Sequence, residues 1–134
     1  MESHNRPRSS VDTEAYWKAA QDGRLLFQRC RSCGEPVFHP RPACPYCLSD
    51  ELAWEESQGK GEIYSFTTQH VPLHPTGKTF EPRNLGIISL DEGFHMFAEI
   101  TAGPGSNLRI GGRVTVWFDD RGDGVTLPKF EVAS

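Results

Sequence analysis

The spacing of apolar side chains predicts a chain rich in β-strands, with one helix near its start. After Gly61, short apolar and β-branched segments place alternate side chains on opposite faces, with the two-residue period of a strand. The predicted strands cover residues 62–70, 85–90, 94–100, 114–118 and 128–133. The sequence Asp91-Glu92-Gly93 predicts a tight turn between the second and the third. Five short strands are too few for a sandwich and favour a small barrel of the OB-fold type.

A helix is predicted over residues 13–21, with Asp12 as its N-cap and Gly23 as its end. Its apolar side chains are those of Tyr16, Trp17, Ala19 and Ala20. This stripe is too wide and too aromatic for a solvated helix. The helix therefore packs either on this chain or on a partner, and its exposed part, with one face of the barrel, is a candidate interface.

Four cysteines lie between the helix and the predicted barrel. They form two C-x-x-C pairs, Cys30 with Cys33 and Cys44 with Cys47, separated by ten residues. Each pair forms a tight knuckle that points two thiolates at one ion, so the spacing predicts a closed, tetrahedral, structural metal site. Gly34 can take a positive φ, which turns backbone N–H groups toward the sulfurs. Zinc is the metal that such a four-thiolate site favours.

Short strands around the cysteines complete a ribbon. Residues 25–27 lead into the first knuckle, residues 37–38 lead away from it, and residues 52–56 leave the second. The predicted organisation is an N-terminal tail and helix (1–22), a rubredoxin-like zinc ribbon (23–58) and a five-stranded OB-fold barrel (59–134). The fold class is mainly β.

Two other interpretations of the cysteines stay open. Iron in a rubredoxin-like site uses the same four ligands. Two disulfides would need an oxidising compartment, and residues 1–10 lack the apolar core of a secretory signal. No stretch has the roughly eighteen consecutive apolar residues of a membrane span. The sequence therefore predicts a soluble, cytoplasmic protein.

The charge of the chain helps to decide whether it could bind nucleic acid. The chain has 14 basic and 18 acidic residues, a net charge of −4, and from Gly59 onward it has 7 basic and 9 acidic residues. Binding of single-stranded nucleic acid is the alternative function, with Tyr64, Phe66, Phe97 and Trp117 as stacking platforms. The predicted barrel has no basic cluster to line a groove for phosphates, and this argues against that alternative.

The sequence holds no motif for independent catalysis. It has no nucleophile elbow, phosphate loop, dinucleotide fingerprint or paired acid and base. His70 and His74 have no carboxylate or cysteine nearby in a coherent motif, which favours ordinary surface histidines. Gly59 and Gly61 are interpreted as turn glycines.

Several short segments follow one another in a fixed order. They are Gly23-Arg24-Leu25, residues 28–34, Pro40-Arg41-Pro42, Gly59-Lys60-Gly61, Tyr64-Ser65-Phe66, residues 90–93, and residues 108–111 with Val114. Together with the helix and the two knuckles, this ordered set resembles the DUF35 family. In that family a rubredoxin-like zinc ribbon is fused to an OB-fold, and the proteins are described as acyl-CoA-associated.

The resemblance implies an accessory subunit. Proteins similar to this one are partners of thiolase-like enzymes, including thiolases, synthases and aldolases, or are domains attached to acyl-CoA hydratases. Their catalytic residues belong mainly to the partner. The resemblance thus implies a hetero-oligomer in which this chain stabilises a thiolase-like acyl-CoA enzyme, with a coenzyme A thioester bound in the complex.

Four arginines, Arg24, Arg29, Arg31 and Arg41, lie around the first knuckle in sequence. One interpretation is charge compensation, because four thiolates around a divalent ion carry a net negative charge. The other is a cradle for the phosphates of coenzyme A, which forked guanidinium donors suit well. Both interpretations stay open.

Overall fold

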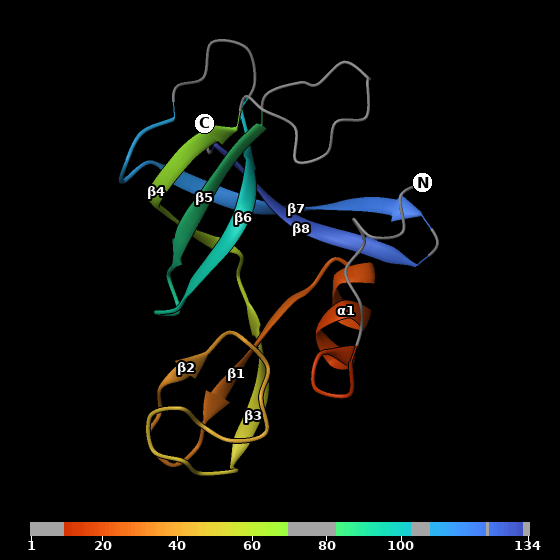
Figure 1. Cartoon of the computed structure of the whole chain (residues 1–134), viewed down its shortest axis with the longest axis vertical. Helices are drawn as coiled ribbons and strands as arrows, with labels where there is room; N and C mark the ends of the chain where they lie inside the picture. The colour runs from red at the N-terminus through yellow and green to blue at the C-terminus, as the bar shows by residue number, and fades with distance from the viewer. Residues whose placement is uncertain (1–9, 70–82, 103–107, 123, 133–134) are drawn as a thin grey trace.

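The computed structural model describes residues 10–69, 83–102, 108–122 and 124–132. The elements are α1 (Glu14–Gln21), β1 (Leu25–Cys30), β2 (Pro36–Val37), β3 (Leu52–Ser57), β4 (Lys60–Gln69), β5 (Arg83–Leu90), β6 (His95–Thr101), β7 (Arg113–Gly122) and β8 (Val125–Val132). A three-stranded ribbon lies at one end, a barrel at the other, and α1 lies beside both (Figure 1). No helix in these ranges is long and apolar enough to span a membrane.

The barrel confirms the predicted OB-type fold. Its strands close in the order β4-β5-β6-β8-β7, and β7 pairs back onto β4. The pair β6 and β8 is parallel, whereas the other neighbours are antiparallel. Side chains alternate along β6, where Met96, Ala98 and Ile100 are buried and His95 and Phe97 are exposed. The two-residue period therefore placed the barrel core correctly.

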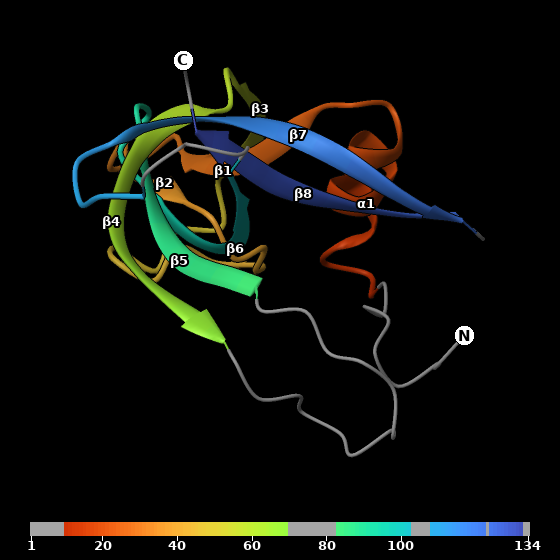
Figure 2. The ribbon, with the colours of Figure 1, turned by 90° about the horizontal axis from the view of Figure 1, so that it is seen from above.

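The last two strands are longer than the sequence predicted. They form a hairpin in which Asp119 pairs with Leu127 and Asp120 with Thr126. Figure 2 shows this hairpin reaching past the barrel and over α1. The apolar pattern ends at Phe118 because residues 120–122, at the outer end of β7, are exposed, so polar residues continue the strand there.

Helix α1 packs on this chain. Tyr16, Ala19 and Ala20 are buried, and the Tyr16 ring meets the rings of Trp17 and Phe38 edge to face, with centroid distances of 4.9 and 5.7 Å. The helix ends before Gly23, whose φ is +76°. Most of its apolar stripe is thus part of the core, while Trp17 is half-buried and lines a groove at the surface.

The predicted N-cap of α1 is wrong. Thr13, and not Asp12, occupies the N-cap position, and it makes no side-chain capping bond. Its hydroxyl instead accepts a hydrogen bond from the backbone N–H of Ser10 at 2.8 Å, and its own backbone N–H donates to the Ser10 carbonyl at 3.1 Å. This turn places Asp12 one residue too early to cap the helix.

The ribbon and the barrel share one core. Strand β1 lies at the centre of the ribbon sheet, in the order β2-β1-β3. Leu25 and Phe27 of β1 belong to the same buried cluster as the barrel residues Ile88 and Phe130. The Phe27 ring also stacks on Phe94, with a centroid distance of 4.8 Å. The division at residues 22/23 and 58/59 stays a prediction.

A carboxylate fixes the junction between ribbon and barrel. Glu92, in the turn between β5 and β6, accepts hydrogen bonds from the Ser57 hydroxyl and the Gln58 backbone N–H, both at 2.8 Å. The Ser57 hydroxyl also accepts the Gly59 backbone N–H at 2.9 Å. Gly59 has a φ of +72°, and a Cβ there would collide with Val116. The chain therefore enters the barrel along one defined path.

Gly61 is a strand residue and not the turn glycine that the sequence predicted. It lies in β4, which pairs with both β5 and β7 at this point. A Cβ at Gly61 would collide with the carbonyl oxygen of Ser89. Close approach of two backbones at the point of barrel closure is what requires glycine here.

Candidate metal centre and its surroundings

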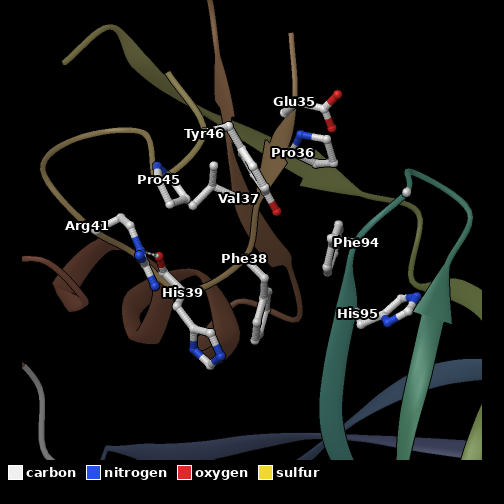
Figure 3. A pocket seen from close by; sticks show the side chains of 11 residues that line it. Glu35, Pro36, Val37, Phe38, His39, Arg41, Pro45, Tyr46, Phe94 and His95 are labelled. Atoms are coloured by element: carbon white, nitrogen blue, oxygen red, sulfur yellow. Dashed lines mark hydrogen bonds between the residues drawn. The ribbon is translucent and has the colours of Figure 1, made fainter. Parts of the chain in front are cut away.

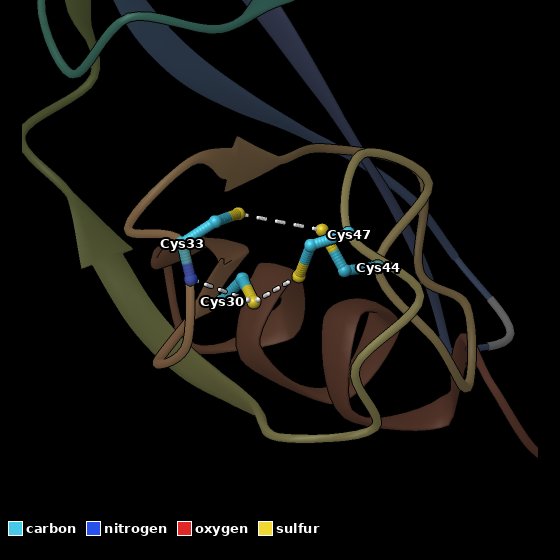
Figure 4. A group of neighbouring side chains, drawn as sticks. All are labelled: Cys30, Cys33, Cys44 and Cys47. Atoms are coloured by element: carbon cyan, nitrogen blue, oxygen red, sulfur yellow. Dashed lines mark hydrogen bonds between the residues drawn. The ribbon is translucent and has the colours of Figure 1, made fainter.

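The four cysteine sulfurs converge on one point. Cys30 ends β1 and Cys33 follows in the first knuckle, while Cys44 and Cys47 form the second knuckle between β2 and β3. Figure 4 shows the four side chains pointing toward one another. Their sulfurs all lie within 4.8 Å of one another, with 3.5 Å between Cys30 and Cys47 and 3.7 Å between Cys33 and Cys44. The spacing in sequence therefore becomes one cluster in space.

The cluster has the dimensions of a tetrahedral metal site. A Zn–S bond of about 2.3 Å places tetrahedral sulfurs about 3.8 Å apart, which is close to the two distances above. All four cysteines are free thiols, and Cys30 and Cys44 are buried. Four thiolates suit zinc or iron, and they fill every position of a tetrahedral ion. The residues present thus fit a structural metal and offer no open position to a substrate.

Backbone donors support the sulfurs in both knuckles. The N–H of Cys33 donates to Cys30 Sγ at 3.5 Å, and the N–H of Tyr46 donates to Cys44 Sγ at 3.4 Å. Gly34 has the positive φ, +80°, that the sequence predicted. Such donors orient a thiolate and offset part of its charge.

The thiol pKa values reflect this geometry. The Cys33 backbone N–H stabilises the Cys30 thiolate and lowers its pKa to about 6. At Cys33 the backbone N–H of Glu35 lowers the pKa, but burial and the neighbouring thiols outweigh it and raise the pKa overall. A first thiolate therefore forms readily, whereas further thiolates are unfavourable beside it. A divalent cation removes that conflict, which is the behaviour expected of a metal site.

Two of the four arginines are already paired. The Arg24 Nε donates to Glu56 Oε1 at 2.9 Å, and the Arg29 Nε donates to Glu55 Oε2 at 3.0 Å. Arg29 also donates from Nη1 to the Gly34 carbonyl at 2.9 Å, which ties it to the first knuckle. The structure thus separates this pair from Arg31, which has no side-chain partner among the described residues.

Arg41 lines a cavity between ribbon and barrel. Figure 3 shows the segment from Glu35 to Tyr46 on one side and Phe94 with His95 on the other. The cavity has a volume of about 360 Å³. The Arg41 backbone N–H donates to the buried Gln28 side chain at 3.0 Å, which fixes the loop. Gln28 has no obvious role in the sequence, although a polar residue inside an apolar strand is a signal that could have drawn attention to it.

A second, more apolar groove lies where α1 meets the barrel. Its volume is about 470 Å³, and Tyr16, Trp17, Met96 and Phe97 supply much of its wall. Lys129 also lines it, but the ammonium group is already 2.6 Å from Asp119 Oδ2 and 3.5 Å from Glu99 Oε1. The groove is therefore apolar, and its lysine is paired within the chain.

The proposed stacking aromatics do not form one exposed platform. Tyr64 and Phe97 are 59% and 67% exposed, but Phe66 packs against the core. The indole N–H of Trp117 donates to the Thr101 hydroxyl at 3.0 Å. His70 and His74 lie outside the described residues.

Comparison with known families agrees with this architecture. The model of the ChsH2 rubredoxin-like zinc ribbon domain matches residues 17–53, and that of the ChsH2 C-terminal OB-fold domain matches residues 54–119. The chain belongs to the DUF35/ChsH2 family. The predicted family and fold are thus confirmed. Its relatives include a protein named as a thiolase subunit and a chain of a structure named as an aldolase.

Individual relatives of this DUF35/ChsH2 chain show the range of the family. The chain is 32% identical over 131 residues to a probable enoyl-CoA hydratase alpha subunit of Thermomonospora curvata, covering 96% of this chain and 40% of that protein. It is 32% identical over 92 residues to the benzoylsuccinyl-CoA thiolase subunit BbsA of Thauera aromatica, covering 66% and 62%. The chain thus spans less than two thirds of either relative.

Among solved structures, the chain is similar to one in the Ltp2-ChsH2(DUF35) aldolase. The TM-score is 0.83 and the sequence identity 29%, over 96% of this chain and 100% of that chain. The likeness therefore extends over helix, ribbon and barrel together.

Proposed function

We propose that this chain is a zinc-binding accessory subunit of a thiolase-like acyl-CoA enzyme, such as a thiolase, a synthase or an aldolase. The observation that carries the proposal is the end-to-end similarity to the chain in the Ltp2-ChsH2(DUF35) aldolase, with a TM-score of 0.83. A related thiolase subunit supports the same class of complex. In this proposal the partner supplies the catalytic residues and this chain stabilises the hetero-oligomer.

Zinc is the proposed metal, held by Cys30, Cys33, Cys44 and Cys47. The sulfur separations and the zinc-ribbon family support this assignment. The role is structural, because the four thiolates leave no position for a substrate. The cytoplasm is the proposed location, since a reducing compartment keeps the thiols available for metal.

A contribution to coenzyme A binding is a further part of the proposal. Arg31 and Arg41 support it best, because Arg24 and Arg29 already bind Glu56 and Glu55. Arg41 borders the cavity between ribbon and barrel, where a bound phosphate would meet its guanidinium group. Substituting Arg31 and Arg41 together by Ala is expected to weaken acyl-CoA binding in the assembled complex, with Arg24→Ala as the matched control.

Binding of single-stranded nucleic acid is the alternative. It receives less support, because two of its four candidate aromatics are engaged inside the fold. A titration with single-stranded DNA at low salt tests it. Tight, salt-sensitive binding would favour this alternative.

The direct test is purification of the tagged chain from a lysate of its source, followed by a moderate-salt wash and mass-spectrometric identification. The proposal predicts a stoichiometric thiolase-like acyl-CoA enzyme subunit in the eluate. A hydratase subunit instead would reassign the reaction class, and nucleic acid with nucleic-acid enzymes would contradict the proposal.

A further inference from the structure

The two metal knuckles share one backbone feature at the residue that directly follows their second cysteine, which is glycine in the first and leucine in the second. In the first, the N–H of Gly34 donates to the Cys30 carbonyl at 2.9 Å, and in the second the N–H of Leu48 donates to the Cys44 carbonyl at 2.9 Å. Both residues directly follow the second cysteine of their pair, with φ of +80° and +66°. Leu48 is the one non-glycine residue with a positive φ in the described ranges.

Leucine is strained at this position. A positive φ brings Cβ close to the backbone, so glycine adopts it freely and leucine does not. Packing could offset that strain, but Leu48 is 81% exposed. Within this chain, the exposed leucine side chain therefore adds no packing that would offset the strain.

Leu48 is part of a small apolar tip with an acidic border. Tyr46, two residues earlier in the same knuckle, is 67% exposed and also lines the cavity between ribbon and barrel. Asp50 and Glu51 follow and are exposed, and their carboxylates have no ion-pair partner in the part of the chain that the structure describes. Interfaces commonly combine an apolar centre containing tyrosine with a polar rim. The tip has that composition.

We propose that Tyr46 and Leu48 form the second-knuckle tip, which inserts into an apolar pocket, bordered by Lys or Arg, on the acyl-CoA enzyme subunit. This inference rests on the proposed function and names the surface that would bind the partner. The exposed carboxylates of Asp50 and Glu51 complement a basic border on the occupant. The apolar groove of a second copy is a poorer match, because it presents Glu99 and its Lys129 is already paired with Asp119 and Glu99. The cavity of a second copy that Arg41 lines is the competing site, and a self-association lost in the knuckle variants would identify it.

The test compares affinities for the acyl-CoA enzyme subunit identified in the pull-down, using the full, zinc-loaded chain. Leu48→Gly is expected to weaken binding about tenfold or more, and so is Tyr46→Ala. The unfolding midpoint of Leu48→Gly should equal or exceed that of the wild type, because glycine relieves the strain. Ile110→Gly is the matched control, because it also removes an exposed apolar side chain, 63% exposed, away from the knuckles. Its affinity should equal that of the wild type.

The outcomes separate this inference from the proposed function. If the wild type binds and both knuckle variants bind within about threefold of it, the inference is wrong and the proposed function stands. If no acyl-CoA enzyme subunit binds the wild type, the proposed function itself fails. If the Leu48→Gly variant does not retain zinc, the Leu48→Asn variant is used in the same measurement, since Asn also tolerates a positive φ. Light scattering measures whether the chain associates with itself. If the wild type self-associates and the knuckle variants lose that association but still bind the partner, the inference is also wrong.

Discussion

Individual charged side chains hold the outer part of the β7–β8 hairpin. Lys129 is only 12% exposed, and its ammonium lies 2.6 Å from Asp119 Oδ2 and 3.5 Å from Glu99 Oε1. It also lies 5.7 Å from the centroid of the Trp117 ring. A hydrogen bond from Lys129, and a second from Arg121, hold the pKa of Asp119 below its usual range. The hairpin thus carries a partly buried ion pair whose strength depends on pH.

The ion pair predicts a pH-dependent stability. Because the folded-state pKa of Asp119 lies below its unfolded value of about 3.9, the pair stabilises the fold above that pH and loses its effect as the pH falls through the folded-state pKa. Asp119→Asn should lower the free energy of unfolding at pH 7 by about 1–2 kcal/mol. The difference from the wild type should shrink between pH 4 and pH 2, as measured by urea unfolding. Asp12→Asn, an exposed control, should have the same free energy of unfolding as the wild type at pH 7 and at pH 2. If the difference between Asp119→Asn and the wild type did not change with pH, the ion pair would not be the source of the stabilisation.

The helix α1 packs mainly into the core of its own chain, while its exposed part, with one face of the barrel, stays a predicted interface. Tyr16 is 8% exposed and joins the buried cluster formed by β1 and the barrel. Burial also raises the pKa of its phenol. The sequence showed an aromatic stripe but could not show what covers it, because an apolar stripe looks the same whether it faces its own chain or another.

Substitution of Tyr16 tests the position of the helix. Tyr16→Ala should lower the free energy of unfolding by about 3 kcal/mol or more, because it leaves a cavity between α1, Phe38 and the barrel. Val11→Ala, at a position that is 93% exposed, should change it by less than about 0.5 kcal/mol. Equal, small effects for both variants in urea unfolding would show that the helix is not packed as described.

The turn between β5 and β6 fixes ribbon to barrel through Glu92. Glu92→Gln should cost about 1–3 kcal/mol, because an amide replaces one of two carboxylate oxygens that accept from Ser57 and Gln58. Glu131→Gln is the exposed control. Hydrogen exchange should show faster exchange of the Gln58 amide in the Glu92 variant, and unchanged protection would remove Glu92 as the contact that fixes this junction.

The sequence predicted local features well and long-range contacts poorly. The alternation of Met96, Ala98 and Ile100 located a barrel strand, and the C-x-x-C spacing located the sulfur cluster, since both depend on neighbouring residues. The pairing of Arg29 with Glu55 depends on the register of β1 against β3, which no local pattern contains. The outer half of the β7–β8 hairpin was missed because its polar residues, such as Asp120, carry no apolar period.

One hydrophobic core connects the ribbon that holds the cysteines to the barrel. Cys30 ends the strand β1, and Leu25 and Phe27 of that strand pack with barrel residues. Loss of the metal should therefore destabilise the barrel as well as the knuckles. A structural metal contributes its binding free energy to folding, about 10–16 kcal/mol in zinc-finger peptides.

Removal of the metal should lower the thermal midpoint of the entire chain. A chelator is expected to lower it by tens of degrees, with ribbon and barrel unfolding together in calorimetry. Without chelator, the thermal midpoint of Cys30→Ser should already be as low as that of the chelator-treated wild type. Adding the chelator to this variant should not lower its midpoint further. An unchanged midpoint after zinc loss, verified by elemental analysis, would contradict a structural role for the metal.

We propose that the zinc-loaded chain functions inside an acyl-CoA enzyme complex. Native mass spectrometry of the complex purified through a tag on this chain tests it most directly, because intact masses report metal, partner and stoichiometry together. We expect one zinc ion per copy of this chain and a bound thiolase-like subunit in a fixed ratio. A chain that carries no zinc, or that is recovered with nucleic acid and no acyl-CoA enzyme, would contradict it.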